Sequence, residues 1–202
     1  MNIQRLFENL EKHRFKPVYC QTRRDAIQYV LNLIPPGAEC GIGGSRTVNQ
    51  LDLDTALVNN GVIVNSHSKF DKERMGELYE RARLSEYYIS SANALTEDGK
   101  IINTDGTANR ISSLLFGPKI IIYLVGINKL VKDIPQGLER IKNIAAPLNC
   151  KRLNKQTPCV TNGTCGDSTH PDCICKATTI MHTPTRLQEK VYVLVINEEL
   201  GF

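Results

Sequence analysis

Two uninterrupted apolar runs, at residues 120–125 and 191–196, constrain the fold of this chain most strongly. A strand with one face in water alternates apolar and polar residues, so runs without alternation predict strands that are covered on both faces. The rest of the chain contains further short apolar runs, at residues 62–64 and 87–89, and segments of helical period, at residues 3–10, 27–34, 75–82 and 138–148. This alternation predicts a three-layer α/β domain with a mostly parallel sheet flanked by helices.

The length of 202 residues fits one domain, 1–202, with a long loop at about 149–186 that is rich in cysteine, threonine and proline. With 41% hydrophobic residues, the chain can build a core without disulfides. Its longest apolar run is far shorter than the roughly 20 residues of a membrane-spanning helix. The charged, amphipathic first 15 residues contain no apolar core of a secretory signal. We therefore expect a cytoplasmic protein that makes no membrane contact.

A first glycine-rich corner lies at residues 40–47, which read CGIGGSRT. It follows a short predicted strand and precedes a predicted helix. Glycines let a backbone approach a ligand closely, and the first amides of a helix favour an anion. Gly43, Gly44, Ser45 and Arg46 are therefore candidate ligand contacts. A tight turn between strand and helix, with Ser45 as the helix cap, explains the same residues without a ligand.

A second corner lies at residues 103–110, which read NTDGTANR. Asp105-Gly106 predicts a turn, and Thr107 is the candidate cap of the helix that follows. A guanidinium in the first turn of that helix would clamp a carboxylate or phosphate through two hydrogen bonds. Asp105, Gly106, Asn109 and Arg110 are thus candidate ligand contacts, although a surface ion pair of Arg110 with Asp105 remains an alternative.

The candidate catalytic residue is Glu97, in the turn Thr96-Glu97-Asp98-Gly99. Residues 95–103 predict a hairpin with this turn at its tip. A partly buried carboxylate there could act as an acid, a base or a nucleophile. A simple hairpin turn is the alternative.

Four of the seven cysteines lie between residues 159 and 175, and Cys159, Cys165, Cys173 and Cys175 are candidate metal ligands. Four thiolates suit a tetrahedral zinc ion or an iron–sulfur cluster, but the spacing matches neither a zinc ribbon nor a ferredoxin. Cys150 is close enough in sequence to substitute for one of them. Thiols that bind no metal are the alternative.

The net charge of +4 is unevenly distributed. Residues 119–155 contain eight lysines and arginines but two acidic residues, Asp133 and Glu139. This stretch lacks interleaved aromatic residues and any known nucleic-acid-binding module, so we expect no nucleic-acid partner. It predicts either a solvated helix face or a site for a small anion.

Together these motifs resemble the lactate-utilisation (LUD) domain family. The resemblance rests on the first corner at 41–45, the turn at 96–99, the second corner at 103–110 and the run Val125-Gly126-Ile127-Asn128-Lys129. The cysteine-rich loop is similar to that of a short, stand-alone subgroup of the family. That subgroup carries a cysteine at the position of Ser168 and a basic residue at the position of Cys173.

The resemblance implies a fold like that of ribose phosphate isomerase, glucosamine phosphate deaminase and the CoA transferases. In such proteins the glycine loop helps to bind phosphate, CoA or acyl oxygens. CoA transferases use a glutamate in a turn similar to residues 96–99, which implies covalent chemistry at Glu97. Family membership further implies a link to the oxidation of lactate to pyruvate, beside iron–sulfur partner subunits.

Two hypotheses follow from the sequence. In the first, the protein serves organic-acid metabolism and binds a small carboxylate, phosphate or CoA-type ligand where the two corners meet. In the second, the cysteine-rich loop makes it a redox or interaction module that carries zinc or an iron–sulfur cluster. We favour the first, with a homodimer as one possible assembly.

Overall fold

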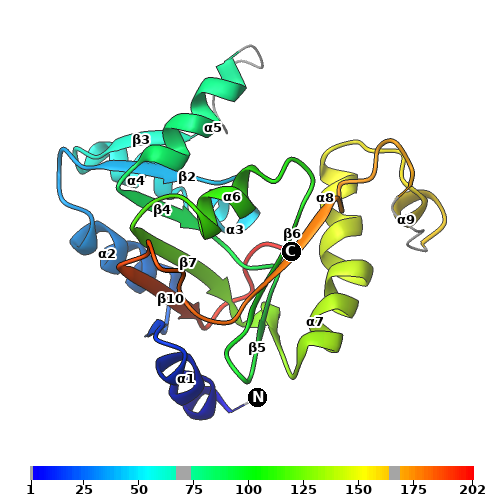
Figure 1. Cartoon of the computed structure of the whole chain (residues 1–202), viewed down its shortest axis with the longest axis horizontal. Helices are drawn as coiled ribbons and strands as arrows, with labels where there is room; N and C mark the ends of the chain where they lie inside the picture. Colours follow the sequence, from blue (N-terminus) through cyan, green and yellow to red (C-terminus); the bar gives the residue numbers. More distant parts are fainter. Residues whose placement is uncertain (1, 67–73, 164–168) are drawn as a thin grey trace.

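A computed structural model describes residues 2–66, 74–163 and 169–202. Its largest element is a six-stranded parallel sheet with the strand order β1-β10-β7-β4-β2-β3 (Figure 1). The strands of this sheet are β1 (Lys16–Cys20), β2 (Glu39–Ile42), β3 (Ile63–Ser66), β4 (Tyr87–Ser90), β7 (Ile120–Gly126) and β10 (Lys190–Ile196). The predicted mostly parallel sheet is confirmed.

The two central strands of this sheet are buried on both faces. On β7, Ile122 and Leu124 join the hydrophobic core on one face, whereas Ile121, Tyr123 and Val125 join the core on the other. Because successive side chains of a strand point to opposite faces, a run without polar positions requires apolar cover on both sides. Helices supply that cover on one side, and helices together with a second sheet supply it on the other.

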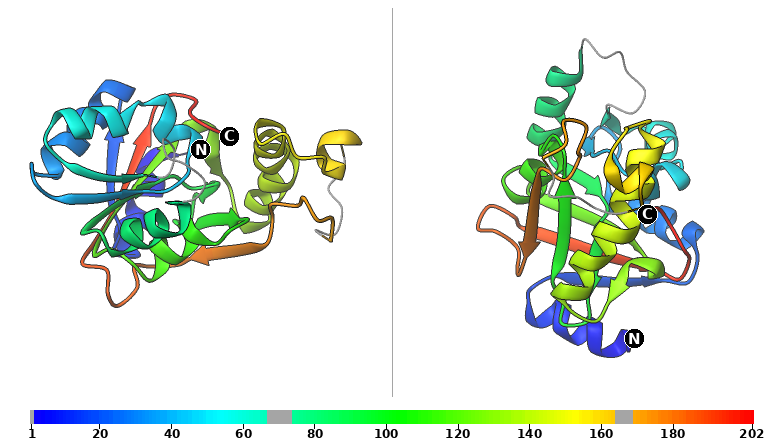
Figure 2. Two further views of the ribbon diagram at one scale, coloured as in Figure 1. Left: turned by 90° about the horizontal axis from the view of Figure 1, so that it is seen from above. Right: turned by 90° about the vertical axis from the view of Figure 1, so that its right-hand side faces the viewer.

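Helices α2, α3 and α4 cover the first face, and α1, α5 and α6 cover the second (Figure 2). Their bounds are α1 (Ile3–Lys12), α2 (Arg23–Leu33), α3 (Arg46–Gln50), α4 (Leu53–Asn59), α5 (Met75–Leu84) and α6 (Asn109–Leu115). Helix α2 begins with the capping box that the sequence predicts, in which Thr22 and Asp25 bond each other's backbone N–H. Within the described residues, no helix is both long and apolar enough to cross a bilayer.

A second sheet of mixed direction has the strand order β8-β5-β6-β9. Its strands are β5 (Ala94–Thr96), β6 (Ile101–Asp105), β8 (Leu130–Val131) and β9 (Ala177–Met181). Strands β5 and β6 form the predicted hairpin, and Gly99 closes its turn at φ +81°, a conformation that favours glycine.

The prediction of an unstructured loop over 149–186 is wrong in part. The helix before it extends to Arg152, a short helix α9 spans Pro158–Thr161, and β9 pairs antiparallel along the whole of β6. Two threonines and partial exposure weaken the apolar pattern of β9, because this strand lies at the edge of its sheet. Strand β9 therefore returns the chain to β6, which carries the second corner.

A long helical rod packs against the second sheet (Figure 1). It consists of α7 (Ile134–Arg140), a π-helical segment η3 (Ile141–Ala145) and α8 (Ala146–Arg152). Asp133 caps its start by accepting a hydrogen bond from the backbone of Gln136. Ile141 joins Ala94, Ile102 and Val131 in one apolar cluster, which fixes the rod against the second sheet.

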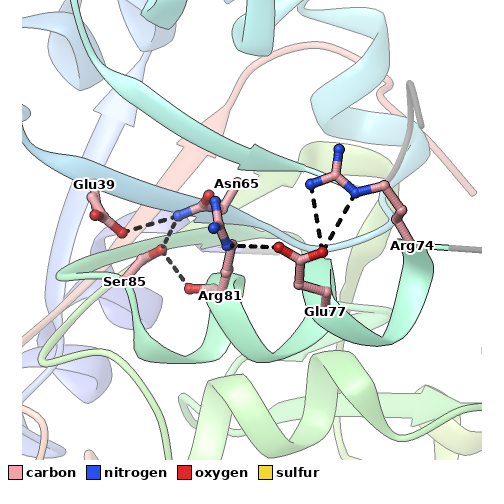
Figure 3. Close-up of polar contacts among 6 residues, drawn as sticks. All are labelled: Glu39, Asn65, Arg74, Glu77, Arg81 and Ser85. Atoms are coloured by element: carbon pink, nitrogen blue, oxygen red, sulfur yellow. Dashed lines mark hydrogen bonds and ion pairs between the residues drawn. The ribbon is translucent and has the colours of Figure 1, made fainter. Parts of the chain in front are cut away.

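A polar network attaches the C-terminal end of α5 to strands β2 and β3 (Figure 3). The amide nitrogen of Asn65 donates to Glu39 at 3.2 Å and to the hydroxyl of Ser85 at 2.9 Å. Ser85 in turn donates to the carbonyl of Arg81, whose guanidinium pairs with Glu77. These contacts hold α5 over the sheet beside the first corner.

Candidate functional site

A cavity of about 190 Å³ lies where β2, β4, β6 and β7 end. Ligands of open α/β sheets bind at the carboxyl ends of the strands, as in this position. Segments from the whole chain meet there, and the cavity is lined by Gly44, Ser45, Arg46, Ser91, Ala92, Asn93, Thr104, Asp105, Gly106, Thr107, Asn109, Arg110, Lys129, Ile141, Ala145, Ala146, Asn149, Arg152, Leu153, Ile174, Cys175 and Phe202. Both glycine-rich corners contribute to this one cavity.

In the first corner, Gly44, Ser45 and Arg46 line the cavity but Gly43 does not. The N–H of Gly43 donates to the carbonyl of Ile89, so it is not available to a ligand. Ser45 caps α3, because its hydroxyl accepts a hydrogen bond from the backbone N–H of Val48 at 3.4 Å. The exposed guanidinium of Arg46 is therefore the group of this corner best placed to meet a ligand.

Gly43 has a packing role instead. A Cβ atom at this position would lie 2.4 Å from the hydroxyl of Tyr88 and 2.9 Å from Cγ of Arg110. Both distances are shorter than real Cβ contacts, so only glycine fits here without displacing its neighbours. This contact also shows how closely the two corners approach each other.

In the second corner, Asp105 caps the start of α6, which is the role that we predicted for Thr107. Its carboxylate accepts hydrogen bonds from the backbone N–H of Thr107 at 3.3 Å and of Arg110 at 3.1 Å. The residue before α6 is Ala108, in the left-handed region at φ 63°, and it provides no side-chain cap. Asp105 thus organises the turn, and its carboxylate is already engaged by the protein.

Two of the three nitrogens of the Arg110 guanidinium contact other groups of the protein. Its Nη2 donates to the carbonyl of Thr104 at 2.7 Å, and its Nε lies 3.4 Å from the carboxylate of Asp105. Both side chains of this ion pair are about 90% buried, so it is not the surface pair of the alternative interpretation. Among the described residues, Nη1 has no hydrogen-bond acceptor, and it remains available to a ligand.

Lys129, which follows β7 on the 3₁₀ turn η2 (Ile127–Lys129), is a cavity residue that we did not predict from the sequence. It is buried, and its Nζ donates to the hydroxyl of Thr47 at 2.7 Å and to that of Ser91 at 2.9 Å. Burial and the nearby charges of Arg140 and Arg110 lower the pKa of Lys129 to about 7. A polar residue three positions after a buried strand, at the edge where the corners meet, is the signal that could have identified it.

Arg140 supports the loops that carry these groups. Its Nε donates to the carbonyl of Asn128 at 2.9 Å and its Nη1 to the carbonyl of Asn93 at 2.6 Å. Burial lowers the pKa of Arg140, but a guanidinium remains charged in proteins. The positive charge of Arg140 therefore lies outside the cavity lining, and it lowers the pKa of Lys129.

Helix α8 forms the wall opposite the first corner, and it also provides a residue that we did not predict. Two nitrogens of the Arg152 guanidinium donate to the side-chain oxygen of Asn149, at 3.0 and 2.9 Å. Burial lowers the pKa of Arg152, and the positive charge of Arg46 lowers it further. Two guanidinium groups from separate walls therefore lie close enough to repel each other.

The structure describes only part of the expected metal site in the cysteine-rich segment. Cys165 lies outside the described residues. In ranges 2–66, 74–163 and 169–202, no group of three or more His, Cys, Asp or Glu side chains is arranged to hold a metal ion. Burial raises the pKa of Cys150, and its neighbours Cys159 and Cys173 raise it further, so these three thiols lie near one another.

The end of the segment instead completes the cavity, since Ile174 and Cys175 line it. The backbone N–H of Lys176 donates to the carbonyl of Asp105 at 3.0 Å, which attaches this end to the second corner.

The structure places Glu97 away from the cavity. Its carboxylate forms an ion pair with Arg5 of α1 at 3.5 Å, and its backbone carbonyl accepts a hydrogen bond from Asn9. The turn that holds Glu97 is thus fixed to the first helix, and Glu97 lines no part of the cavity formed by the two corners.

One solved structure shares this fold over nearly its whole length. A DUF162 family protein from Deinococcus radiodurans is similar over 96% of this chain and 95% of that chain, with a TM-score of 0.57 and 11% sequence identity. The Pyrococcus horikoshii OT3 translation initiation factor eIF-2B aligns with 55% of this chain and 47% of that one, at 16% identity and a TM-score of 0.31. No curated protein matches the sequence.

The sequence also matches the family model of the LUD domain over residues 3–196. The matched region includes both glycine-rich corners, Lys129, the helical rod and β10. The chain therefore belongs to the LUD domain family.

Proposed function

We propose that this LUD domain protein binds a small anionic metabolite, a carboxylate or a phosphate ester, in the cavity between the two corners, and that it serves organic-acid metabolism. The charge of the cavity wall supports this most directly. Among the described residues that line it, the basic side chains are Arg46, Arg110, Lys129 and Arg152, and Asp105 is the one acidic side chain.

The arrangement of these charges favours a ligand over an internal network. Asp105 is engaged by two backbone amides and by Arg110, so its charge does not neutralise Arg46 and Arg152. An anion between those two guanidinium groups would convert their repulsion into two charge-assisted hydrogen bonds. The Nη1 group of Arg110 would provide a third contact.

The size of the cavity narrows the ligand class. A volume of about 190 Å³ is smaller than the roughly 300–1,000 Å³ of pockets for drug-sized ligands. A small carboxylate or a short phosphate ester fits, whereas a whole CoA would extend into solvent. Lactate and pyruvate, which the family resemblance implies, are within this size.

Thermal unfolding with a panel of anions tests the proposal. The panel contains lactate, pyruvate, inorganic phosphate, a short phosphate ester and acetyl-CoA, each at several salt concentrations. We expect at least one small carboxylate or phosphate ester to raise the Tm, with an effect that weakens as ionic strength rises. If no member of the panel stabilises the protein, the proposal is wrong.

Calorimetric titration of the best ligand then locates the site. We expect Arg110→Lys to weaken binding, because a lysine loses the forked geometry of the guanidinium. The matched control is Arg83→Lys on α5, where the arginine pairs with Glu80 and lies outside the cavity lining. Equal affinities of both variants and the wild type would place the ligand elsewhere.

A further inference from the structure

The hydrogen bonds around Lys129 restrict the protonation of its amine. The Thr47 hydroxyl donates to the carbonyl of Leu200, and the Ser91 hydroxyl to that of Leu124 at 2.5 Å. Since each hydroxyl hydrogen is used in this way, both oxygens accept an N–H from Lys129. Two N–H groups of the amine are therefore satisfied.

The third position on Nζ distinguishes an ammonium from a neutral amine. An ammonium carries a third N–H, and in the described part of the chain no further acceptor and no carboxylate pairs with Lys129. A neutral amine has a lone pair at that position instead and satisfies all its donors. The buried charges of Arg110 and Arg140 also favour the neutral form, because they repel a positively charged ammonium.

A neutral lysine amine beside an anion site is a nucleophile. Enzymes that form Schiff bases activate lysine by desolvation or by a neighbouring cation, and both conditions hold here. Lys129 and its partner Ser91 both line the cavity, so a bound ligand would lie next to this pair.

We infer that Lys129 forms an imine with the carbonyl carbon of a small anionic ligand whose acidic group is bound by the arginines of the cavity. The inference rests on the proposed anion site and specifies its substrate class, a carbonyl compound that carries a carboxylate or phosphate group.

The step is balanced without an oxidant or a reductant. The lone pair of Nζ attacks the carbonyl carbon, a C–N bond forms, and the carbonyl electrons move to the oxygen. That oxygen leaves as water with the two protons that the amine loses, and a C=N double bond remains. Ser91 already accepts one N–H of the amine, so it is a positioning residue that holds the amine in place during this step.

Reductive trapping tests the inference on the wild-type protein. The protein is incubated with cyanoborohydride and one of two ketones, either pyruvate, which carries a carboxylate, or dihydroxyacetone phosphate, which carries a phosphate. Modified lysines are then mapped by peptide mass spectrometry. We expect an adduct at residue 129 that forms faster than at exposed lysines by on the order of a hundredfold, because an amine with a pKa near 7 is far more often neutral.

The two ligands separate the possible sources of the anionic group. Preferential trapping of pyruvate assigns a carboxylate as the recognised group, and preferential trapping of dihydroxyacetone phosphate assigns a phosphate. Either result supports the imine. Adducts spread evenly over exposed lysines, with none enriched at Lys129, would overturn it.

Variants separate this inference from the anion site itself. Lys129→Met keeps most of the length of the side chain but has no amine, so we expect it to lose the adduct, whereas binding of a non-carbonyl anion such as lactate or phosphate is measured on the wild type. Lys132→Met, at an exposed lysine nearby, is the control and should keep the adduct. Anion binding by the wild type without an adduct would refute the imine alone, whereas no anion binding at all would refute the proposed function and the imine with it.

Discussion

The two glycine-rich corners and the cysteine-rich segment border the same cavity, but the sequence determines their geometry to different degrees. In the corners, Asp105 and Ser45 bond backbone amides within a few residues, which fixes each turn locally. In the cysteine-rich segment, the thiols of Cys150 and Cys159 lie on separate helices and interact with each other, but the described residues contain no group of three or more side chains arranged to hold a metal ion. Turn-forming residues therefore specify the local geometry of a corner, whereas a count of potential ligands does not specify the geometry of a site.

The largest expected effect tests the contact between the corners. We expect Gly43→Ala to lower the free energy of unfolding by about 3 kcal/mol, because the new Cβ would overlap Tyr88 and Arg110. It should also displace the Arg110 guanidinium and abolish anion binding. Urea unfolding measures the first effect and calorimetry the second.

Gly76→Ala is the matched control for this substitution. Gly76 lies on α5 with open space at its Cβ position, so alanine there should stabilise the protein by about 0.5–1 kcal/mol. If Gly43→Ala is as well tolerated as Gly76→Ala, the two corners do not depend on each other as described.

The next effect concerns the arginine that joins the corners. We expect Arg110→Gln to weaken binding of the best anion by about 10- to 100-fold, the value of one charge-assisted hydrogen bond. Calorimetric titration at fixed ionic strength measures it. A change of less than about twofold, within the error of such a titration, would remove Arg110 from the site.

The pH dependence of stability tests the burial of Lys129. Between a folded-state pKa of about 7 and its ordinary value of 10.5, the unfolded chain binds more protons at this lysine than the folded chain does. Raising the pH in this window therefore stabilises the wild type relative to Lys129→Met, by up to about 1.4 kcal/mol per pH unit. Arg110 and Arg140, the charges that face this amine, do not titrate in this range.

Denaturant unfolding of both proteins from pH 7 to pH 9 measures this difference. Lys132→Met should show no such slope relative to the wild type, because that lysine is exposed. A flat difference between the wild type and Lys129→Met would mean that Lys129 titrates as an ordinary lysine.

The smallest effect is expected in the cysteine-rich segment. The double variant Cys159→Ser/Cys173→Ser should change the free energy of unfolding by less than about 1 kcal/mol, because both residues are half-buried. A metal chelator should leave the Tm of the wild type unchanged. A large fall in Tm with chelator would show a structural metal, since such sites contribute directly to folding.

The sequence specified the sheet well, because strands covered on both faces leave an unmistakable apolar pattern in β7 and β10. It also identified the segments that border the cavity, since turn residues act locally. It did not reveal Lys129, whose environment depends on Thr47, Ser91 and Arg140, from three distant parts of the chain. Strand β9 was missed because its stability comes from pairing with β6 rather than from its own composition.

The π-helical segment η3 determines what the wall formed by α8 presents to a ligand. A π turn accommodates one more residue than an α turn, and each residue of an α-helix rotates the next side chain by about 100°. Ile141 and Ala145, at the two ends of η3, line the cavity together with Asn149 and Arg152 downstream. Deleting one residue from η3 would therefore rotate Asn149 and Arg152 away from the cavity, while the start of the rod would keep its contacts with the second sheet. The length of this short segment thus determines whether the positive charge of Arg152 faces a ligand.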